Sequence, residues 1–271
     1  MIDERSEELL GELDRICREI VAGTTGNKDR FFELTREGSH PPIISGLAES
    51  FGMMLVKVET REFQLEQKIE ELKENYKRTR RMLDGMVLSL VTTLEHRDPY
   101  TAGHGRRVME LSCAIAESMG FDSDRLEGLK IAGLLHDIGK IAIPLEILSK
   151  PGRLSEIEFN LIKLHPQTGY DILASIEFPW PVAQFVLQHH RKIDGTGYPV
   201  LLADEEIPLE ARILGVADVV EAMASHRPYR PALGLDRALE EIERNRETAY
   251  DPEVVDTCTS LFRSGTFSFH H

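Results

Sequence analysis

Apolar positions recur every three or four residues along most of this chain, which is the spacing of an amphipathic helix. Residues 3–22 form the first such stretch. A shorter one covers about 28–37, between a Thr-Thr-Gly-Asn break and a Gly-Ser-His-Pro-Pro turn. From about residue 43 to residue 96 the pattern runs without interruption. We therefore expect a small helical N-terminal region followed by one long helix.

The long helix carries a narrow apolar seam in alternating steps of three and four residues. Nine of its twelve positions are apolar, and the residues between them are largely charged or Gln. Such a seam over about five heptads predicts a parallel coiled coil and hence a homodimer. The alternative is an ordinary amphipathic helix packed on its own domain, but the charged stretch 59–81 leaves one narrow seam and favours the coiled coil. The seam positions are Leu55, Val58, Glu62, Leu65, Ile69, Leu72, Tyr76, Thr79, Leu83, Met86, Leu90 and Thr93.

Beyond residue 96 the pattern is helical throughout, and no convincing period-two strand occurs. The chain therefore predicts an all-α fold. The connection 192–207 is long for a compact domain, and such loops are usually functional. The expected helices cover 103–119, 124–137, 155–175, 179–191, 208–225, 233–245 and 252–263. The expected parts are a helical input or dimerisation region (1–57), a coiled-coil linker (58–95), a helical bundle (96–265) and a tail (266–271).

Composition narrows the possible partners. The 271 residues are 41% hydrophobic, which suffices for one or two domains with a sizeable core. A net charge of −14 disfavours binding of long nucleic acids. Three dispersed cysteines do not form a disulfide framework. The sequence begins without signal-peptide features and lacks an 18-residue apolar stretch, so we expect no membrane span and a cytoplasmic location.

The candidate chemistry lies in a series of histidines and aspartates. A neighbouring imidazole and carboxylate, three further imidazoles and a late carboxylate match the ligands of a two-metal hydrolytic site, with Asp137 able to bridge two cations. A single histidine on an apolar face is usually a satisfied core residue. For the whole set that alternative leaves Asp137 as a buried, unpaired charge. Their spacing predicts a different helix for each ligand. The set is His136, Asp137, His165, His189, His190 and Asp218.

Six motifs in the helical bundle match a known family in order and spacing. They are Asp98-Pro-Tyr-Thr-Ala-Gly-His104, Leu134-Leu-His-Asp-Ile-Gly-Lys140, His165-Pro166, Gln188-His-His190, Asp194-Gly-Thr-Gly-Tyr-Pro199 and Arg227-Pro-Tyr-Arg230. This part of the chain resembles the HD-GYP domain, the bacterial cyclic di-GMP phosphodiesterases of the HD metallohydrolase superfamily. The N-terminal third is similar only in style to helical signalling linkers and sensory modules.

The resemblance implies a role for each matching position. The six residues of the candidate set become metal ligands. Lys140 would face a substrate phosphate, and Tyr198, Arg227 and Arg230 would hold guanines and phosphates of cyclic di-GMP. His104 corresponds to a histidine near the metals, a ligand in some members of the family only. The catalytic residues implied are Asp137, Lys140 and His104; Lys140, His104 and a metal-bound water are the candidate proton donors to the leaving oxygen.

The resemblance also bears on the metals. Some members hold a third metal through a Glu one turn before the family histidine, and this chain has Tyr100 there. We therefore expect two divalent ions. Mixed imidazole and carboxylate ligands suit iron or manganese best, with zinc or nickel also possible.

Two departures from the family pattern concern substrate preference and rate. Arg191 follows the histidine pair where the family has Glu, and 200–204 replaces an Arg-Gly-Leu continuation. The expected activity is hydrolysis of cyclic di-GMP to pGpG or GMP. One alternative is a catalytically weak cyclic-dinucleotide receptor or interaction module. Another is a different HD enzyme, such as a mononucleotide phosphohydrolase or an iron oxygenase, against which Tyr198, Arg227 and Arg230 argue.

Overall fold

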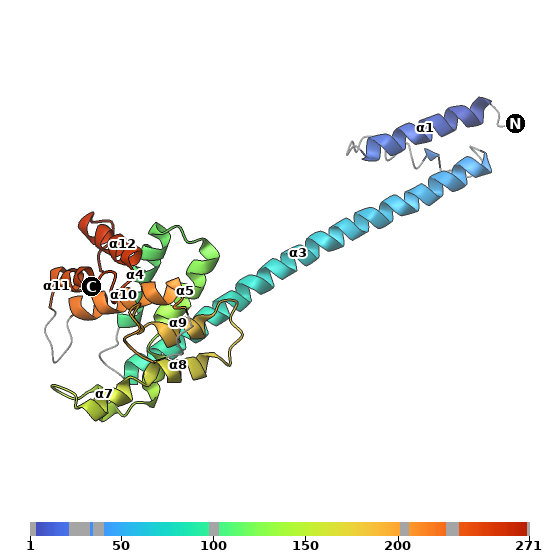
Figure 1. Cartoon of the computed structure of the whole chain (residues 1–271). Coiled ribbons are helices and arrows are strands. Elements are labelled where there is room, and N and C mark those ends of the chain that lie inside the picture. The colour runs from blue at the N-terminus through green and yellow to red at the C-terminus, as the bar shows by residue number, and fades with distance from the viewer. Residues whose placement is uncertain are drawn as a thin grey trace. The chain divides into compact units, whose positions relative to one another are not determined.

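The computed structural model describes residues 4–21, 33–34, 41–97, 103–200, 206–225 and 233–269. Within these ranges the regular elements are helices (Figure 1). Two isolated β-bridges are the only extended pairing among the described residues. The predicted all-α class is therefore confirmed. The elements are α1 (Glu4–Val21), α3 (Pro42–Arg97), α4 (His104–Ser118), α5 (Ser123–Leu135), the 3₁₀ helix η2 (Ile138–Ala142), α6 (Leu145–Leu148), α7 (Glu156–Ile162), α8 (His165–Leu173), α9 (Val182–Gln188), α10 (Leu209–Ala224), α11 (Leu235–Arg244) and α12 (Pro252–Arg263).

The long helix expected from residue 43 to residue 96 is α3, which continues unbroken from Pro42 to Arg97. The chain divides into two compact units, Met1–Arg81 and Met82–His271, and α3 contributes to both. The domain limits drawn from the sequence remain predictions. Neither α3 nor any other described helix combines the length and the apolar character needed to cross a membrane.

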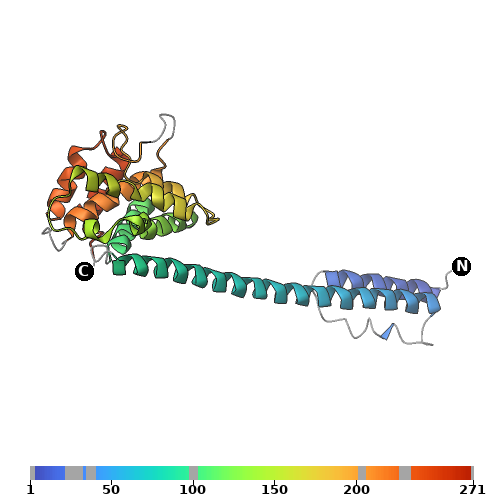
Figure 2. The same ribbon diagram turned by 90° about the horizontal axis from the view of Figure 1, so that it is seen from below.

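In the N-terminal unit, α1 and the first part of α3 lie side by side in both views (Figures 1 and 2). They share a small apolar core, because α1 presents one apolar face to α3. The buried residues of this core are Leu13, Ile16, Leu34 and Ala48, with Leu9, Phe51 and Leu55 packed against them. The first seam position, Leu55, therefore has partners within its own unit. Most of the helical piece expected at 28–37 lies outside the described residues.

The second unit is a bundle built around α10. Helix α4 packs against α5 and α10, α9 joins α5 to α8, and α11 and α12 pack on α10. Its core contains fully buried residues from several of these helices, including Leu111, Leu129, Leu173 and Ile213. Val87 and Val91 extend this core into the last turns of α3. The bundle thereby brings ends of α4, α5, α8 and α9 together beside the middle of α10.

Three helices end earlier than the sequence pattern predicts. The stretch 155–175 is two helices, α7 and α8, and Pro166 lies in the first turn of the second. Proline lacks the N–H that a continuing helix needs but is well tolerated at a helix start. Helix α5 stops at Leu135 rather than 137, and α9 at Gln188 rather than 191. The short helix α6 was not predicted. The early ends matter because each lies beside a candidate ligand.

Candidate metal centre

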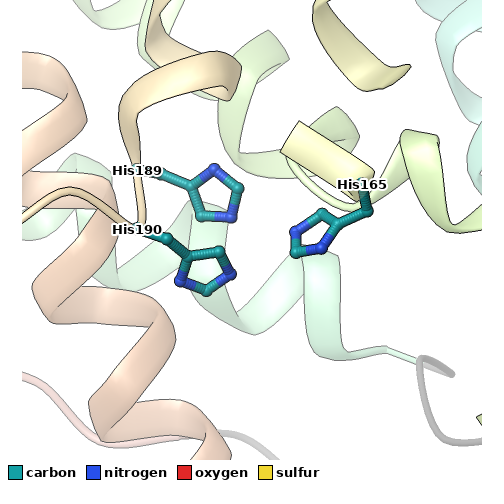
Figure 3. A group of neighbouring side chains, drawn as sticks. All are labelled: His165, His189 and His190. Carbon is teal, nitrogen blue, oxygen red and sulfur yellow. The ribbon is translucent and has the colours of Figure 1, made fainter. Parts of the chain in front are cut away.

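The structure brings the candidate residues into two neighbouring groups that could each hold a metal ion. The first group is His165, His189 and His190, whose rings converge in Figure 3. The second group is His104, His136 and Asp218. Within each group the potential ligand atoms lie within 4.8 Å of one another. Two ligands bonded to one ion at about 2.1 Å are at most about 4.2 Å apart, so a small contraction suffices.

Most of these residues lie at the ends of different helices, whereas the expected helix ranges placed them within helices. His104 and His165 are the first residues of α4 and α8. His136 and His189 directly follow α5 and α9, with Asp137 and His190 next in the chain. In both groups only Asp218 lies inside a helix, α10. The ends of α4, α5, α8 and α9 meet beside the flank of α10 that carries Asp218, and this convergence makes the site compact.

A shared backbone contact orients three of the imidazoles. The Nδ1 atoms of His136, His165 and His189 lie 2.8, 2.8 and 2.6 Å from the carbonyl oxygens three residues earlier, at Gly133, Ile162 and Val186. Those carbonyls belong to the last turns of α5, α7 and α9, where helix carbonyls have no intrahelical partner. A carbonyl can only accept, so Nδ1 carries the proton and Nε2 keeps the lone pair that a metal needs.

His104 is oriented differently, by a residue that sequence reasoning missed. Its Nδ1 lies 2.5 Å from Oε2 of Glu221. Nε of Arg107 donates to Oε1 of the same carboxylate, and Nη2 of Arg107 lies 2.6 Å from that oxygen. The Ser225 hydroxyl also donates to Oε1, at 2.7 Å. The available signal was spacing: Glu221 lies one turn after Asp218 on α10, so the two share a helix face.

Both aspartates extend between the two groups. Asp137 has Oδ1 at 3.5 Å from Nε2 of His165 and Oδ2 at 3.5 Å from Nε2 of His136. Asp218 has Oδ1 at 3.2 Å from Nε2 of His104 and Oδ2 at 3.8 Å from Nδ1 of His190. Each carboxylate therefore turns one oxygen towards each group, which is the geometry of a bridging ligand.

Burial and charge prepare these side chains as ligands. Burial lowers the pKa of His165 to about 4 and that of His190 to about 3, so both rings are neutral at pH 7. Burial opposes ionisation of Asp137, but Lys140 and the imidazoles hold its pKa well below the usual value. The Nζ of Lys140 lies 2.6 Å from Oδ2 of Asp137. Neutral imidazoles and ionised carboxylates are the forms that coordinate metals.

His104 has the opposite tendency. Burial works against a charged ring, yet the carboxylates of Asp218 and Glu221 raise the pKa of His104 to about 9. Burial likewise opposes the charge of Glu221, whose pKa is nevertheless lowered to about 2 by His104, Ser225 and Arg107. A cation entering the second group would therefore replace a proton on His104, because coordinated histidine is neutral.

Two buried nitrogens show that a metal fits this arrangement. The Nε2 atoms of His165 and His189 are buried and have no hydrogen-bond partner among the described residues. A buried polar atom without a partner costs about 1–3 kcal/mol. Both atoms belong to the first group, and a divalent cation there would satisfy them. The donor set therefore fits a metal ion.

Gly139 allows Asp137 and His165 to approach each other. A Cβ at this position would lie 1.9 Å from the carbonyl oxygen of His165 and 2.6 Å from the backbone nitrogen of Gly169. Both are backbone atoms, so a side chain would force η2 and α8 apart. Gly139 thus holds the turn that carries Asp137 against the start of α8.

The Gly-Tyr-Pro loop folds back on the histidine pair. Gly197, at φ +89°, forms an isolated bridge with Arg191, and a Cβ there would lie 2.2 Å from the carbonyl oxygen of His190. This contact brings the ring of Tyr198 to 4.6 Å from that of His190, between centroids. Tyr198 therefore borders the first group. The predicted positions Arg227, Arg230 and Tyr100 lie outside the described residues.

Comparison with known proteins agrees with this geometry. The family model described as "HD domain" matches residues 89–254, more than half of the chain. The chain belongs to the HD domain family. The HD-GYP recognition made from the sequence motifs is confirmed by the relatives of this HD domain.

One relative is the "Cyclic di-GMP phosphodiesterase response regulator RpfG" of Xanthomonas campestris, 41% identical over 62% of this chain and 45% of its own length. Another is the "3'3'-cGAMP-specific phosphodiesterase 3" of Vibrio cholerae, 40% identical over 63% of this chain and 37% of its own. The chain thus spans less than half the length of these relatives. Among solved structures, the HDG"Y"P protein Bd1817 from Bdellovibrio bacteriovorus shares the fold, with a TM-score of 0.50 and 22% identity over 59% of this chain and 51% of its own.

The close approach at Gly139 yields a test of how the HD domain is assembled. We expect Gly139→Ala to lower the free energy of unfolding by about 1–3 kcal/mol, because the added methyl meets backbone that must shift. Gly85→Ala is the control: that glycine is helical and a methyl group added there would have nothing within 4 Å, so its stability should stay the same or rise by up to about 1 kcal/mol. Chemical denaturation measures both. Equal stability of the two variants would contradict the role given to Gly139.

Proposed function

We propose that the chain is a metal-dependent phosphodiesterase that hydrolyses a cyclic dinucleotide, with cyclic di-GMP as the expected substrate. The observation that carries this proposal is the pair of histidine and aspartate groups spanned by Asp137. Two-metal sites with a shared carboxylate suit in-line displacement at phosphorus. The relatives include phosphodiesterases named for cyclic di-GMP and for 3'3'-cGAMP, which supports the substrate class. A role in bacterial second-messenger signalling and a cytoplasmic location remain predictions.

In this proposal the two groups hold two divalent ions. His165, His189 and His190 hold one, and His136 and Asp218 hold the other together with His104. Asp137 spans both positions and fixes their separation. The mixture of imidazole and carboxylate favours iron or manganese, with zinc or nickel possible. His104 thus moves from a candidate proton donor to a candidate ligand, because its Nε2 lies 3.2 Å from both Nε2 of His136 and Oδ1 of Asp218.

The chemistry is divided between the metals and the side chains around them. Bound divalent ions would lower the pKa of a water molecule from about 16 to about 7 and neutralise charge on the phosphate oxygens. Lys140 keeps Asp137 ionised and brings a cation to the same surface, where a phosphate oxygen can be held. Its ammonium is also a candidate proton donor to the 3′ oxygen as that oxygen leaves. Lys140 therefore has both a binding and a proton-transfer role.

Tyr198 is the described residue best placed to contact the rest of the substrate. Its ring lies beside His190 and borders the first group from the Gly-Tyr-Pro loop. Burial raises the pKa of Tyr198, so its hydroxyl stays protonated and can donate a hydrogen bond. Arg227 and Arg230 are predicted to hold guanines and phosphates beside it.

We also propose that α3 forms a parallel coiled coil between two copies of the chain. The middle of the predicted seam is exposed: Val58, Leu65, Ile69, Leu72 and Tyr76 all lie on the surface of the helix. Ion pairs such as Lys68–Glu71 and Lys77–Glu74 occupy its flanks. A second copy would bury the seam. Leu55 and Leu83 are less suited to it, because each packs against the core of its own unit.

The activity is tested by incubating metal-loaded protein with cyclic di-GMP and separating the products by chromatography. We expect the wild type to form pGpG or GMP. Asp137→Ala should lose more than about 100-fold in turnover, beyond the usual 10–100-fold cost of removing a residue that only supports a ligand. Tight binding without cleavage in the presence of iron, manganese or nickel would refute the enzyme and favour a receptor. Neither binding nor cleavage would refute the substrate.

The dimer is tested by light scattering on seam variants. We expect the wild type to be a dimer at micromolar concentration and Leu65→Lys with Leu72→Lys to be a monomer, because charges are not tolerated in a coiled-coil seam. Gln64→Lys with Gln67→Lys adds the same charge on exposed positions outside the seam and should remain dimeric. A monomeric wild type, or dissociation of both variants alike, would contradict the coiled coil.

A further inference from the structure

His104 differs from the other oriented histidines in the group that its Nδ1 contacts. His136 and His189 follow helix C-termini, and His165 follows the C-terminal turn of α7, so each meets a free carbonyl. His104 is the first residue of α4. At a helix N-terminus the groups without intrahelical partners are N–H donors. The start of α4 thus offers no free carbonyl, and whereas His165 uses one from the preceding helix α7, Nδ1–H of His104 donates to a side-chain carboxylate.

Glu221 supplies the missing acceptor from another helix. The residue is 1% exposed, and its Oε2 meets Nδ1 of His104 at 2.5 Å. Its neighbour one turn earlier on α10, Asp218, has Oδ1 at 3.2 Å from Nε2 of the same ring. Two carboxylates on one helix face thus hold the two nitrogens of one imidazole. This grip fixes the ring plane and directs Nε2 towards His136.

Glu221 is itself held in place by contacts that do not involve His104. The Arg107 guanidinium and the Ser225 hydroxyl both contact Oε1, at 2.6 and 2.7 Å. Arg107 lies one turn after His104 on α4, so it ties the carboxylate back to the helix that carries the ring. Oε2 is left for His104. The Nδ1 contact of His104 therefore depends on one replaceable side chain, whereas those of the other three rings are to the backbone.

We propose that Glu221 is a positioning residue that controls occupancy of the second metal position and not of the first. The inference rests on the proposed two-metal function. Carboxylates behind a metal-bound histidine fix its tautomer and orientation, and their loss typically weakens metal binding by about 10–100-fold. The first group contains His165 and His189, whose orientation comes from backbone carbonyls that a substitution at Glu221 leaves in place. Removal of Glu221 should therefore weaken metal binding at the second position and leave the affinity of the first unchanged.

The test is a titration of metal-stripped full-length protein with Mn²⁺, followed by elemental analysis and electron paramagnetic resonance. We expect wild-type protein to bind two Mn²⁺ per chain with a magnetically coupled signal. Glu221→Gln removes the charge at nearly constant shape. It should bind one Mn²⁺ with wild-type affinity and the second about 10–100-fold more weakly, with the signal of an isolated ion. A general loss of structure would weaken both positions.

Two further variants keep the result interpretable. Ser225→Ala removes a contact to the same carboxylate without touching His104, and it should bind both ions as the wild type does. Glu221→Asp keeps the charge but withdraws it from His104, so it should show the same selective loss of binding at the second metal position. This variant replaces Glu221→Gln if Glu221→Gln does not fold. Two tightly bound ions in both Glu221 variants, or equal weakening of both positions, would overturn the inference alone. A wild type that binds no Mn²⁺ would overturn the proposed metal site and this inference with it.

Discussion

The hydrogen bond from an imidazole Nδ1 to a helix-end carbonyl is the interaction on which the site depends. Helices α5, α7 and α9 each end with carbonyls that lack intrahelical partners, and a histidine three residues later donates to one of them. The contact closes the end of a helix and fixes a side chain at the same time. It also places the ring proton on Nδ1, so Nε2 faces the centre of the site with a lone pair that can bind a proton or a metal ion. A local requirement of helix ends thereby produces three oriented imidazoles.

The same arrangement makes the site electrostatically costly without cations. Two buried Nε2 atoms have no hydrogen-bond partner among the described residues. The buried carboxylates of Asp137 and Asp218 lie close to His165 and His190, respectively. Lys140 and a protonated His104 offset part of this charge. Divalent ions would offset it more completely, because they satisfy lone pairs and carboxylates together. The bundle therefore supplies a frame whose centre is suited to divalent cations.

Helical periodicity in the sequence predicts the all-α class and the long helix to within a residue at each end, since both depend on local pattern. The candidate residues His136, Asp137, His165, His189, His190 and Asp218 are predicted as a set, and the structure brings all six together. The breaks at Leu135 and Gln188 are not predictable in this way, because the tertiary approach at the histidines overrides the helical pattern. Glu221 was missed because its role depends on a contact across 117 positions of sequence. The approach at Gly139 is equally non-local.

We propose that two metal ions occupy two neighbouring positions spanned by Asp137. Anomalous X-ray diffraction from Mn²⁺-loaded crystals tests it most directly. We expect two anomalous peaks about 3.5–4 Å apart, one bounded by His165, His189 and His190 and the other by His104, His136 and Asp218. A single peak, or two peaks that Asp137 does not join, would contradict it.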